Sequence, residues 1–414
     1  CVFTDTYRKN IFPRSGIYNA INSSYVIKCP HEWEGNQCKY CDFVCNHESG
    51  YVNGICTTCG RACTHQNLNE DFFCNDCKQQ MVVKVETTDG TVTYDPDFTA
   101  AMDAAENGTV VTLLTDAELS QNVSIYGSGK TVTLNLNGHS AASPGRVIRI
   151  GVTDSDEGNK GGTLKMVGNG NILTSVVVNP TGALDWSGWT GGRIKYVAVY
   201  RATHVTGSIP SDAYIGELLI TGHESERIDK INEITLDSGR FGTVSWQNFR
   251  GVAMPLGALL APGYAFKSEE SNTLLPYTDT LAAPYSSIYN VTVVKCEEHY
   301  DANGDGKCDY CNEQIVAYVT DKSGANSYFT DLQDALDTLD NTYTVTLLED
   351  ANGSYTAAKG SGFRIRMNGK TINEITFTGE ATVSLNDTGS INSLTFSGNA
   401  ARFTAGNPYI KMKT

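Results

Sequence analysis

The amino-acid sequence predicts an all-β protein built from many short strands. Glycine is frequent, at 40 of 414 residues, whereas proline is rare, at 11, and this composition suits strands and tight turns better than helices. From Met81 onward, short runs rich in Val, Ile, Leu and Thr are separated by Gly, Asn, Ser and Asp, and apolar and polar residues alternate inside the runs. Such even, turn-rich spacing without long helices is typical of a β-solenoid, a sandwich or a propeller.

An internal repeat favours the solenoid. Val-Thr-Leu-Leu at residues 111–114 recurs at 345–348, and Leu-Asn-Leu-Asn-Gly at 134–138 is matched by Ile-Arg-Met-Asn-Gly at 365–369. Repeated strand-turn units of this kind stack on one another in solenoids. At about 20 to 29 residues per coil, residues 82–295 have room for about nine coils, and the region from about residue 315 onward has room for about four.

A short amphipathic helix is predicted before each copy of the repeat. Apolar residues recur there at i, i+3, i+4 and i+7, which places them on one face of about three helical turns. They are Phe98, Ala101, Met102 and Ala105 before the first copy, and Leu332, Ala335, Leu336 and Leu339 before the second. We expect Asp97 and Thr330 to be the N-caps. Each helix would cover the open end of a strand stack and prevent edge pairing.

The 13 cysteines form the most specific pattern in the chain. Twelve of them fall into four modules of three cysteines and one histidine, each ending in Cys-x2-Cys, and Cys1 is left over. The modules are Cys29, His31, Cys38 and Cys41; Cys45, His47, Cys56 and Cys59; Cys63, His65, Cys74 and Cys77; and Cys296, His299, Cys308 and Cys311. Three thiolates and one imidazole make a closed tetrahedral zinc site, which holds structure and leaves no position for catalysis, so we expect about four zinc ions.

Other interpretations of the cysteines fit less well. Disulfides would suit an extracellular chain, but three cysteines per module would force bonds between modules and leave the histidines unexplained. Redox chemistry lacks a surrounding βαβ pattern. Nucleic-acid binding is disfavoured because only Lys39 and Arg61 are basic between Cys29 and Cys77, and the whole chain has 31 basic against 46 acidic residues. Modules of about 17 residues have little core of their own, so a metal would supply much of their folding energy.

The fourth module contains a second candidate metal motif. Residues 301–309 carry oxygen-bearing side chains at loop positions 1, 3, 5 and 9 and a glycine at position 6. This spacing is typical of a calcium loop, in which position 7 contributes its carbonyl oxygen. The calcium ligands would be Asp301, Asn303, Asp305, Lys307 and Asp309. Asn312 stands at position 12, where a bidentate Glu is usual, so the alternative is a solvated polar turn.

These patterns together resemble a family of bacterial surface proteins. The order helix, Val-Thr-Leu-Leu, Asn-Gly is similar to the right-handed parallel β-helix domains of large surface proteins of Gram-positive gut bacteria. The string H-x-D-x-N-G-D-G-K-C-D-x-C from His299, and Leu-Leu-Ala-Pro-Gly-Tyr-Ala-Phe at 259–266, also resemble motifs of that group. The resemblance covers most of residues 29–414. It implies right-handed β-helix domains with helical N-terminal caps, and a family of adhesins, host-factor binders, immunoglobulin-binding superantigens and polysaccharide-active proteins.

The expected organisation has five parts. They are an N-terminal segment (1–28), three tandem zinc modules (29–80), a parallel β-helix domain (81–295), a fourth zinc or calcium module (296–314) and a second, truncated β-helix domain (315–414). The chain starts without Met or an apolar leader, and we expect a mature form or a fragment. No segment suits a membrane span, because the most apolar stretch, 252–266, is short and contains two prolines. We expect a secreted or cell-surface protein.

The expected function is non-enzymatic binding of a host macromolecule, either a protein such as an immunoglobulin or a glycan. Aromatic and Arg side chains dominate interfaces, and Trp also stacks on sugar rings. The candidate anchors are Trp186, Trp189, Trp246, Phe249 and Arg250. The alternative for each tryptophan is a place in the solenoid interior.

Two other functions are weighed against binding. A polysaccharide lyase or glycoside hydrolase would need carboxylates on the β-helix flank. The candidates are Asp154, Asp156 and Glu157 with Arg146, Arg149 and Lys160 nearby, and then His204, His223, Glu224, Glu226 and Arg227. Glycines and polar residues surround them, which also suits plain surface loops. In a purely structural role, the zinc modules would be stiff joints in a cell-surface stalk.

Overall fold

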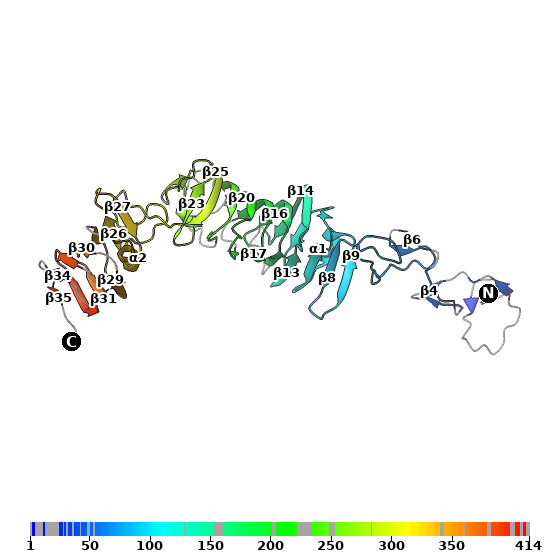
Figure 1. Ribbon diagram of the computed structural model, residues 1–414. Coiled ribbons are helices and arrows are strands. Elements are labelled where there is room, and N and C mark those ends of the chain that lie inside the picture. The colour runs from blue at the N-terminus through cyan, green and yellow to red at the C-terminus, as the bar shows by residue number, and fades with distance from the viewer. Residues whose placement is uncertain are drawn as a thin grey trace. The chain divides into compact units, whose positions relative to one another are not determined.

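The computed structural model of the chain is mainly β, with 52% strand and 5% helix. It describes residues 2–4, 11–12, 25–27, 29, 32–34, 37–41, 43–47, 50–52, 54–127, 129–152, 161–200, 204–221, 234–247, 253–282, 284–339, 343–358, 361–378, 382–397, 402–405 and 409–410. The chain forms two compact units, Cys1–Val176 and Val177–Thr414, which are described separately (Figure 1). No helix of the described residues is long and apolar enough to cross a membrane.

The first unit begins with short antiparallel strands. One three-stranded sheet has the order β2-β1-β3, and each of the two hairpins that follow belongs to a cysteine module. The strands are β1 (Val2–Thr4), β2 (Ile11–Phe12), β3 (Tyr25–Ile27), β4 (Trp33–Glu34), β5 (Gln37–Cys38), β6 (Tyr51–Val52) and β7 (Ile55–Cys56). Strands β4 to β7 have two residues each, and the buried residues in them are Cys38 and Cys56.

The rest of the first unit has strands that alternate between two sheets. In one sheet β8 and β9 are antiparallel, and β10, β13 and β15 continue in parallel; in the other, β11 and β12 pair in parallel with β14, which neighbours β16. The strands are β8 (Val83–Glu86), β9 (Val92–Asp95), β10 (Val110–Leu113), β11 (Ala117–Glu118), β12 (Val123–Ile125), β13 (Lys130–Asn135), β14 (Ser140–Ile150), β15 (Gly162–Gly168) and β16 (Asn171–Val178). Val111, Leu134 and Met166 pair in register and are fully buried, so the alternating residues stack as one aliphatic row.

Both predicted helices are present. Helix α1 (Phe98–Ala104) is capped by Asp97, whose carboxylate accepts from Thr99 N at 2.8 Å, and it packs on β8, β9, β10 and β12 through its apolar face. Helix α2 (Leu332–Asp337) begins one residue later than expected. Its N-cap is Asp331, whose carboxylate accepts from the backbone N–H of Gln333 at 2.6 Å. An N-cap side chain bonds to the N–H group two or three residues later, which has no partner inside the helix. Thr330 is therefore not the cap.

The second unit starts with another pair of alternating series. Strand β17 pairs in parallel with β19, and β18, β20 and β21 are parallel neighbours, followed by antiparallel β25 and by β23 at the sheet edge. The elements are β17 (Gly182–Trp189), β18 (Arg193–Tyr200), β19 (His204–Thr206), β20 (Tyr214–Thr221), β21 (Arg240–Gln247), β22 (Met254–Pro255), the 3-10 helix η1 (Leu256–Leu259), β23 (Tyr264–Ser268), β24 (Thr280–Leu281) and β25 (Tyr285–Lys295). The antiparallel strands end the parallel series.

The C-terminal part of the second unit repeats this plan more regularly. After the antiparallel strands β26 and β27, four strands join one sheet and four join another, alternately and in parallel (Figure 1). The strands are β26 (Ala317–Thr320), β27 (Asn326–Phe329), β28 (Thr344–Leu347), β29 (Ala351–Ala357), β30 (Ser361–Arg366), β31 (Thr371–Thr378), β32 (Thr382–Asn386), β33 (Ser390–Ser397), β34 (Arg402–Ala405) and β35 (Tyr409–Ile410). Val345, Ile365 and Leu385 pair at steps of 20 residues and are fully buried.

The all-β class and the long, mostly parallel sheets confirm the coarse expectation. In the C-terminal part, each of the two sheets has four parallel strands, which fits the estimate of about four repeats there. In the earlier part, paired strands are farther apart in the sequence, since Lys130 pairs with Gly162 and Tyr214 with Arg240, and the last strands turn antiparallel. The estimate of nine coils stays a prediction. Closure of the strands into a right-handed β-helix, and the five-part division, stay predictions.

Candidate metal centres

The four cysteine modules share one backbone frame. In each, the N–H of the first cysteine of Cys-x2-Cys donates to the carbonyl five residues later, and the residues just outside this bond form an antiparallel bridge. These bonds are Cys38 to Phe43 at 2.9 Å, Cys56 to Arg61 at 2.8 Å, Cys74 to Gln79 at 2.8 Å and Cys308 to Glu313 at 2.9 Å. The sequence repeat is thus also a structural repeat. The Cys-x2-Cys turn brings the sulfurs of its two cysteines toward the sulfur of the module's first cysteine.

Modules two and four gather all four expected ligand atoms. In module two, Cys45 Sγ lies 3.7 Å from Cys56 Sγ, and His47 Nδ1 lies 3.7 Å from Cys45 Sγ and 3.6 Å from Cys59 Sγ. In every such set the ligand atoms lie within 4.8 Å of one another. A tetrahedral zinc with bonds of about 2.3 Å to sulfur and about 2.0 Å to nitrogen needs edges of about 3.8 Å and 3.5 Å. The observed edges fit that tetrahedron.

Module four has the same geometry, although its histidine follows the first cysteine by three residues instead of two. Cys296 Sγ and Cys308 Sγ are 3.8 Å apart, and His299 Nδ1 is 3.6 Å from Cys311 Sγ. A disulfide would bring two sulfurs to about 2.0 Å. Every described cysteine is a free thiol. The sulfurs are therefore spaced to share an ion rather than to bond to each other.

Modules one and three are gathered in part. In module one, Cys29, Cys38 and Cys41 form a three-sulfur cluster, and His31 lies outside the described residues. Module three gives two triads that share Cys63: one adds His65 and Cys77, and the other adds Cys74 and Asp76. The Nε2 atom of His65 is buried and has no hydrogen-bond partner in the described part of the chain. A buried, unpartnered imidazole nitrogen is costly, so the donor set fits a ligand that engages this ring.

The electrostatics of the clusters favour a cation. Backbone N–H groups of the Cys-x2-Cys turn, led by that of Cys59, lower the pKa of the Cys56 thiol to about 6. At Cys38, burial opposes ionisation, but the N–H of Tyr40 and its neighbours lower the pKa to about 6. Burial raises the pKa of Cys63 to about 12. The turn thus favours the thiolate at Cys38 and Cys56, whereas a nearby cation would favour ionisation of the Cys63 thiol.

The histidine of modules two and three sits in an unusual backbone conformation. The φ angles of His47 and His65 are 62° and 53°, a left-handed region that residues other than glycine rarely enter. This turn brings the backbone N–H of His47 to the Cys45 thiol, which lies two residues earlier. Strained backbone of this kind persists where surrounding groups fix it, and it is common at ligand clamps.

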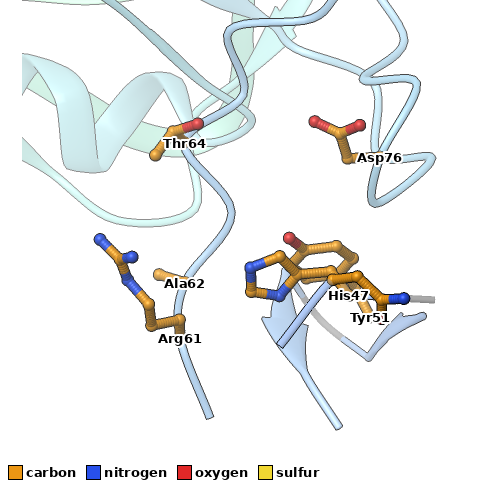
Figure 2. Close-up of a pocket in the computed structure, with 7 residues that line it drawn as sticks. His47, Tyr51, Arg61, Ala62, Thr64 and Asp76 are labelled. Carbon is orange, nitrogen blue, oxygen red and sulfur yellow. The ribbon is translucent and has the colours of Figure 1, made fainter. Parts of the chain in front are cut away.

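A polar cavity of about 420 Å³ flanks module two (Figure 2). Figure 2 shows the His47 ring against Tyr51, with Arg61 and Asp76 on the facing walls. The two rings stack with centroids 5.6 Å apart and an interplanar angle of 22°. The stack and the sulfur contacts at Nδ1 together fix the plane of the imidazole, as supporting residues around metal ligands do.

The expected calcium loop is a hydrogen-bonded turn. Asp301 is buried and its carboxylate accepts from the N–H groups of Gly304 at 2.7 Å, Asp305 at 3.2 Å and Gly306 at 3.0 Å. The remaining polar atoms are used in the same way: Asn303 accepts from Asp305 N, Asp305 from Lys307 N, and Asp309 from Ala302 N. Among the described residues no three acidic, Cys or His ligand atoms gather at this loop. These contacts fit the polar-turn alternative, but a carboxylate that accepts N–H groups keeps acceptor sites for an ion, so the calcium site stays a prediction.

The three candidate tryptophan anchors are core residues, so their assignment to an exposed surface is wrong. Trp186, Trp189 and Trp246 are 1%, 2% and 0% exposed. Trp186 shares the inward phase of Leu184 on β17, and its Nε1 donates to Gly207 O at 2.6 Å. Alternation of side chains along β17 predicts that Trp186 points inward, but the nearby glycines make the segment look like a loop in the sequence.

The other sequence candidates are only partly described. Arg146 and Arg149 are exposed on β14, and only the backbone of His204 is described, in β19. The remaining candidates lie outside the described residues: Phe249, Arg250, Asp154, Asp156, Glu157, Lys160, His223, Glu224, Glu226 and Arg227.

Sequence reasoning missed the residue seven positions after the first cysteine of each pair. In modules one and two this residue is the first cysteine of the next module, Cys45 or Cys63; after modules three and four it is Met81 or Ile315, both 0% exposed. The N–H groups of Cys63, Met81 and Ile315 each donate back into the preceding hairpin, at 2.7, 2.8 and 2.8 Å. The 18-residue period through 45, 63 and 81 is the signal that could have revealed it.

Comparisons of the chain with protein-family models, with curated proteins and with solved structures find no match.

Proposed function

We propose that the chain is a non-enzymatic, secreted or cell-surface binding protein in which right-handed parallel β-helix domains are joined by Cys3His zinc modules. The modules act as rigid joints, each holding one zinc ion, for about four per chain. The β-helix surfaces bind a host macromolecule, either a protein such as an immunoglobulin or a glycan. The tetrahedral edge lengths in modules two and four support zinc as the ion.

The observation that carries the joint role is the way in which module four is attached on both sides. On the preceding side, Cys296 N donates to Gly263 O at 2.8 Å and Tyr277 N donates to Asp309 O at 2.8 Å. On the following side, His299 forms an antiparallel bridge with Tyr328, and Ile315 packs in a cluster with the module's cysteines. A segment bonded in this way at both ends is stiffer than a Gly-Ser linker.

Metal analysis and hydrogen exchange test this proposal. We expect about four zinc ions per chain by elemental mass spectrometry, and thiols that react only after denaturation in chelator. In Cys308→Ser, one zinc should be lost and amide exchange should rise at 263–277 and 326–329, which flank module four. Exchange in β13 and β15, remote in sequence from this module, should stay unchanged and is the internal control. A protein without zinc, or a Cys308→Ser variant with unchanged flanks, overturns the joint role.

A purely structural stalk is the second candidate function. Burial of Trp186, Trp189 and Trp246 favours it, because it removes three of the five candidate anchors of the binding hypothesis. A pull-down from mucosal secretions separates the two: retention of a defined protein or glycan supports binding, and retention of nothing supports the stalk. The lyase or hydrolase alternative has no supporting observation among the described residues.

A further inference from the structure

A groove of about 1050 Å³ lies beside module four, and sequence reasoning did not identify it. Three tyrosines form its aromatic wall: Tyr300 and Tyr310 from the module itself and Tyr328 from β27. Further lining residues come from β23, the loop after it and the end of β25. Its volume is at the upper end of the range for sites that enclose small ligands.

The tyrosine rings form a connected platform. Tyr300 stacks on Tyr310 with ring centroids 6.4 Å apart and an interplanar angle of 24°, and it meets Tyr328 edge-on at 6.2 Å and 86°. Tyr318 supports Tyr328 from β26 at 5.8 Å. Tyr300 is 49% exposed, so the platform presents an aromatic surface to the groove and to solvent. Side chains locked against one another lose little entropy when a ligand binds.

The module's backbone holds the platform in place. Tyr300 follows the ligand His299, Tyr310 precedes the ligand Cys311, and Asp309 N donates to Tyr300 O at 2.7 Å. The two rings therefore come from opposite arms of one hairpin. Any group that fixes this hairpin also fixes the distance between the rings.

The rest of the groove is polar but has balanced charge. The lining contains two lysines, Lys267 and Lys295, and two glutamates, Glu297 and Glu298, and this balance disfavours both polyanions and polycations. Besides the aromatic rings and the apolar Leu274 and Val294, the uncharged lining has amides and hydroxyls, at Asn272, Thr273, Asn326 and Ser327. These groups both donate and accept hydrogen bonds, as the hydroxyl groups of a sugar do.

We propose that this groove binds a neutral oligosaccharide, with the Tyr300–Tyr310 platform stacking against the sugar rings and the amides and hydroxyls bonding to the ring hydroxyls. This inference rests on the glycan branch of the proposed function. A concave groove of this size suits a short, uncharged chain. A typical protein interface buries about 800 Å² on each partner and centres on a packed anchor, and the aromatic rings here line a hollow instead.

Affinity electrophoresis tests the site on the full chain with zinc retained. The probes are gels containing starch, galactomannan, xyloglucan or arabinoxylan, with polygalacturonate and heparin as anionic comparisons. We expect at least one neutral polymer, and neither anionic one, to retard the protein. Tyr300→Ala and Tyr310→Ala should each weaken that binding about tenfold or more, whereas Tyr300→Phe, which keeps the ring, should retain most of it.

Two controls keep the outcomes distinct. Tyr289→Ala removes a tyrosine of the same unit that is 64% exposed but lies outside the groove lining, and it should bind as the unaltered protein does. Zinc content measured on every variant separates loss of the groove from loss of module four. No retardation by any neutral polymer, an equal effect of Tyr289→Ala, or capture of an immunoglobulin preparation through Tyr300 without polysaccharide binding overturns the proposal.

Discussion

Replacing Ile315 by Ala should loosen module four from the β-strands that follow it. Ile315 is 0% exposed, packs with Cys296, Cys308 and Cys311, and donates its N–H to Gly306 O at 2.8 Å. The substitution removes three buried carbons, which costs about 2.4 kcal/mol at about 0.8 kcal/mol each. A partly collapsed cavity adds about 1 kcal/mol. We therefore expect local opening to become easier by about 3 kcal/mol, a factor of about a hundred.

Hydrogen exchange followed by mass spectrometry measures this opening directly. Exchange should accelerate about a hundredfold in peptides covering 296–315 and should also rise in β28, which lies beyond the junction. Ile55→Ala is the matched control: Ile55 is 46% exposed in module two, and its loss should change exchange less than about fivefold. If Ile315→Ala affects only the peptide that carries residue 315, the side chain does not couple the module to its neighbour, and the reasoning fails.

Three further substitutions test the core, an ion pair and a turn. Trp246→Ala should destabilise the second unit by about 3–5 kcal/mol in thermal unfolding, because the removed side chain is 0% exposed. Arg240 donates to the Glu269 carboxylate at 2.8 and 3.2 Å and lowers its pKa below the ordinary 4.5. The pair's small contribution to stability is present above the ordinary pKa and is lost as pH falls through the lowered one. The urea-unfolding difference between the unaltered protein and Arg240→Gln should thus exist at neutral pH and vanish in acid. Asn312 has a φ of 58°, so Asn312→Val should cost about 1–2 kcal/mol in local stability by hydrogen exchange, and Asn312→Gly almost nothing.

The metal clusters were predictable because their signal is local. Cys-x2-Cys closes within one turn, and the histidine two or three residues after the first cysteine returns to the same point through a left-handed residue or a short loop. The strand pattern was predictable for a similar reason, since side chains alternate whatever the strand's neighbours are. Val111 and Val345 occupy matching buried positions because the same alternating segment recurs.

The remaining features depend on contacts that spacing does not encode. Asp301 has the position of a calcium ligand, and spacing alone does not predict that its carboxylate also accepts hydrogen bonds from three backbone N–H groups of its own loop. Trp189 follows Trp186 by three residues, out of phase, and both are buried because Ser187–Gly188 shifts the strand's alternation. The groove beside module four joins tyrosines from two segments that only the fold brings together.

The position seven residues after the first cysteine of each Cys-x2-Cys pair explains how one module can serve both in series and at a boundary. When this residue is Cys45 or Cys63, the hairpin passes directly to the next ligand set, and no flexible linker separates the sites. When it is Met81 or Ile315, the same position enters an aliphatic cluster, with Leu114 near Met81 and Leu348 near Ile315. We therefore expect a bound metal to be the main support within the series, and burial to add a second support at the boundaries. Chelation should consequently raise amide exchange first in modules one and two and later around Met81 and Ile315, and a simultaneous rise would mean that the aliphatic contacts add no stiffness of their own.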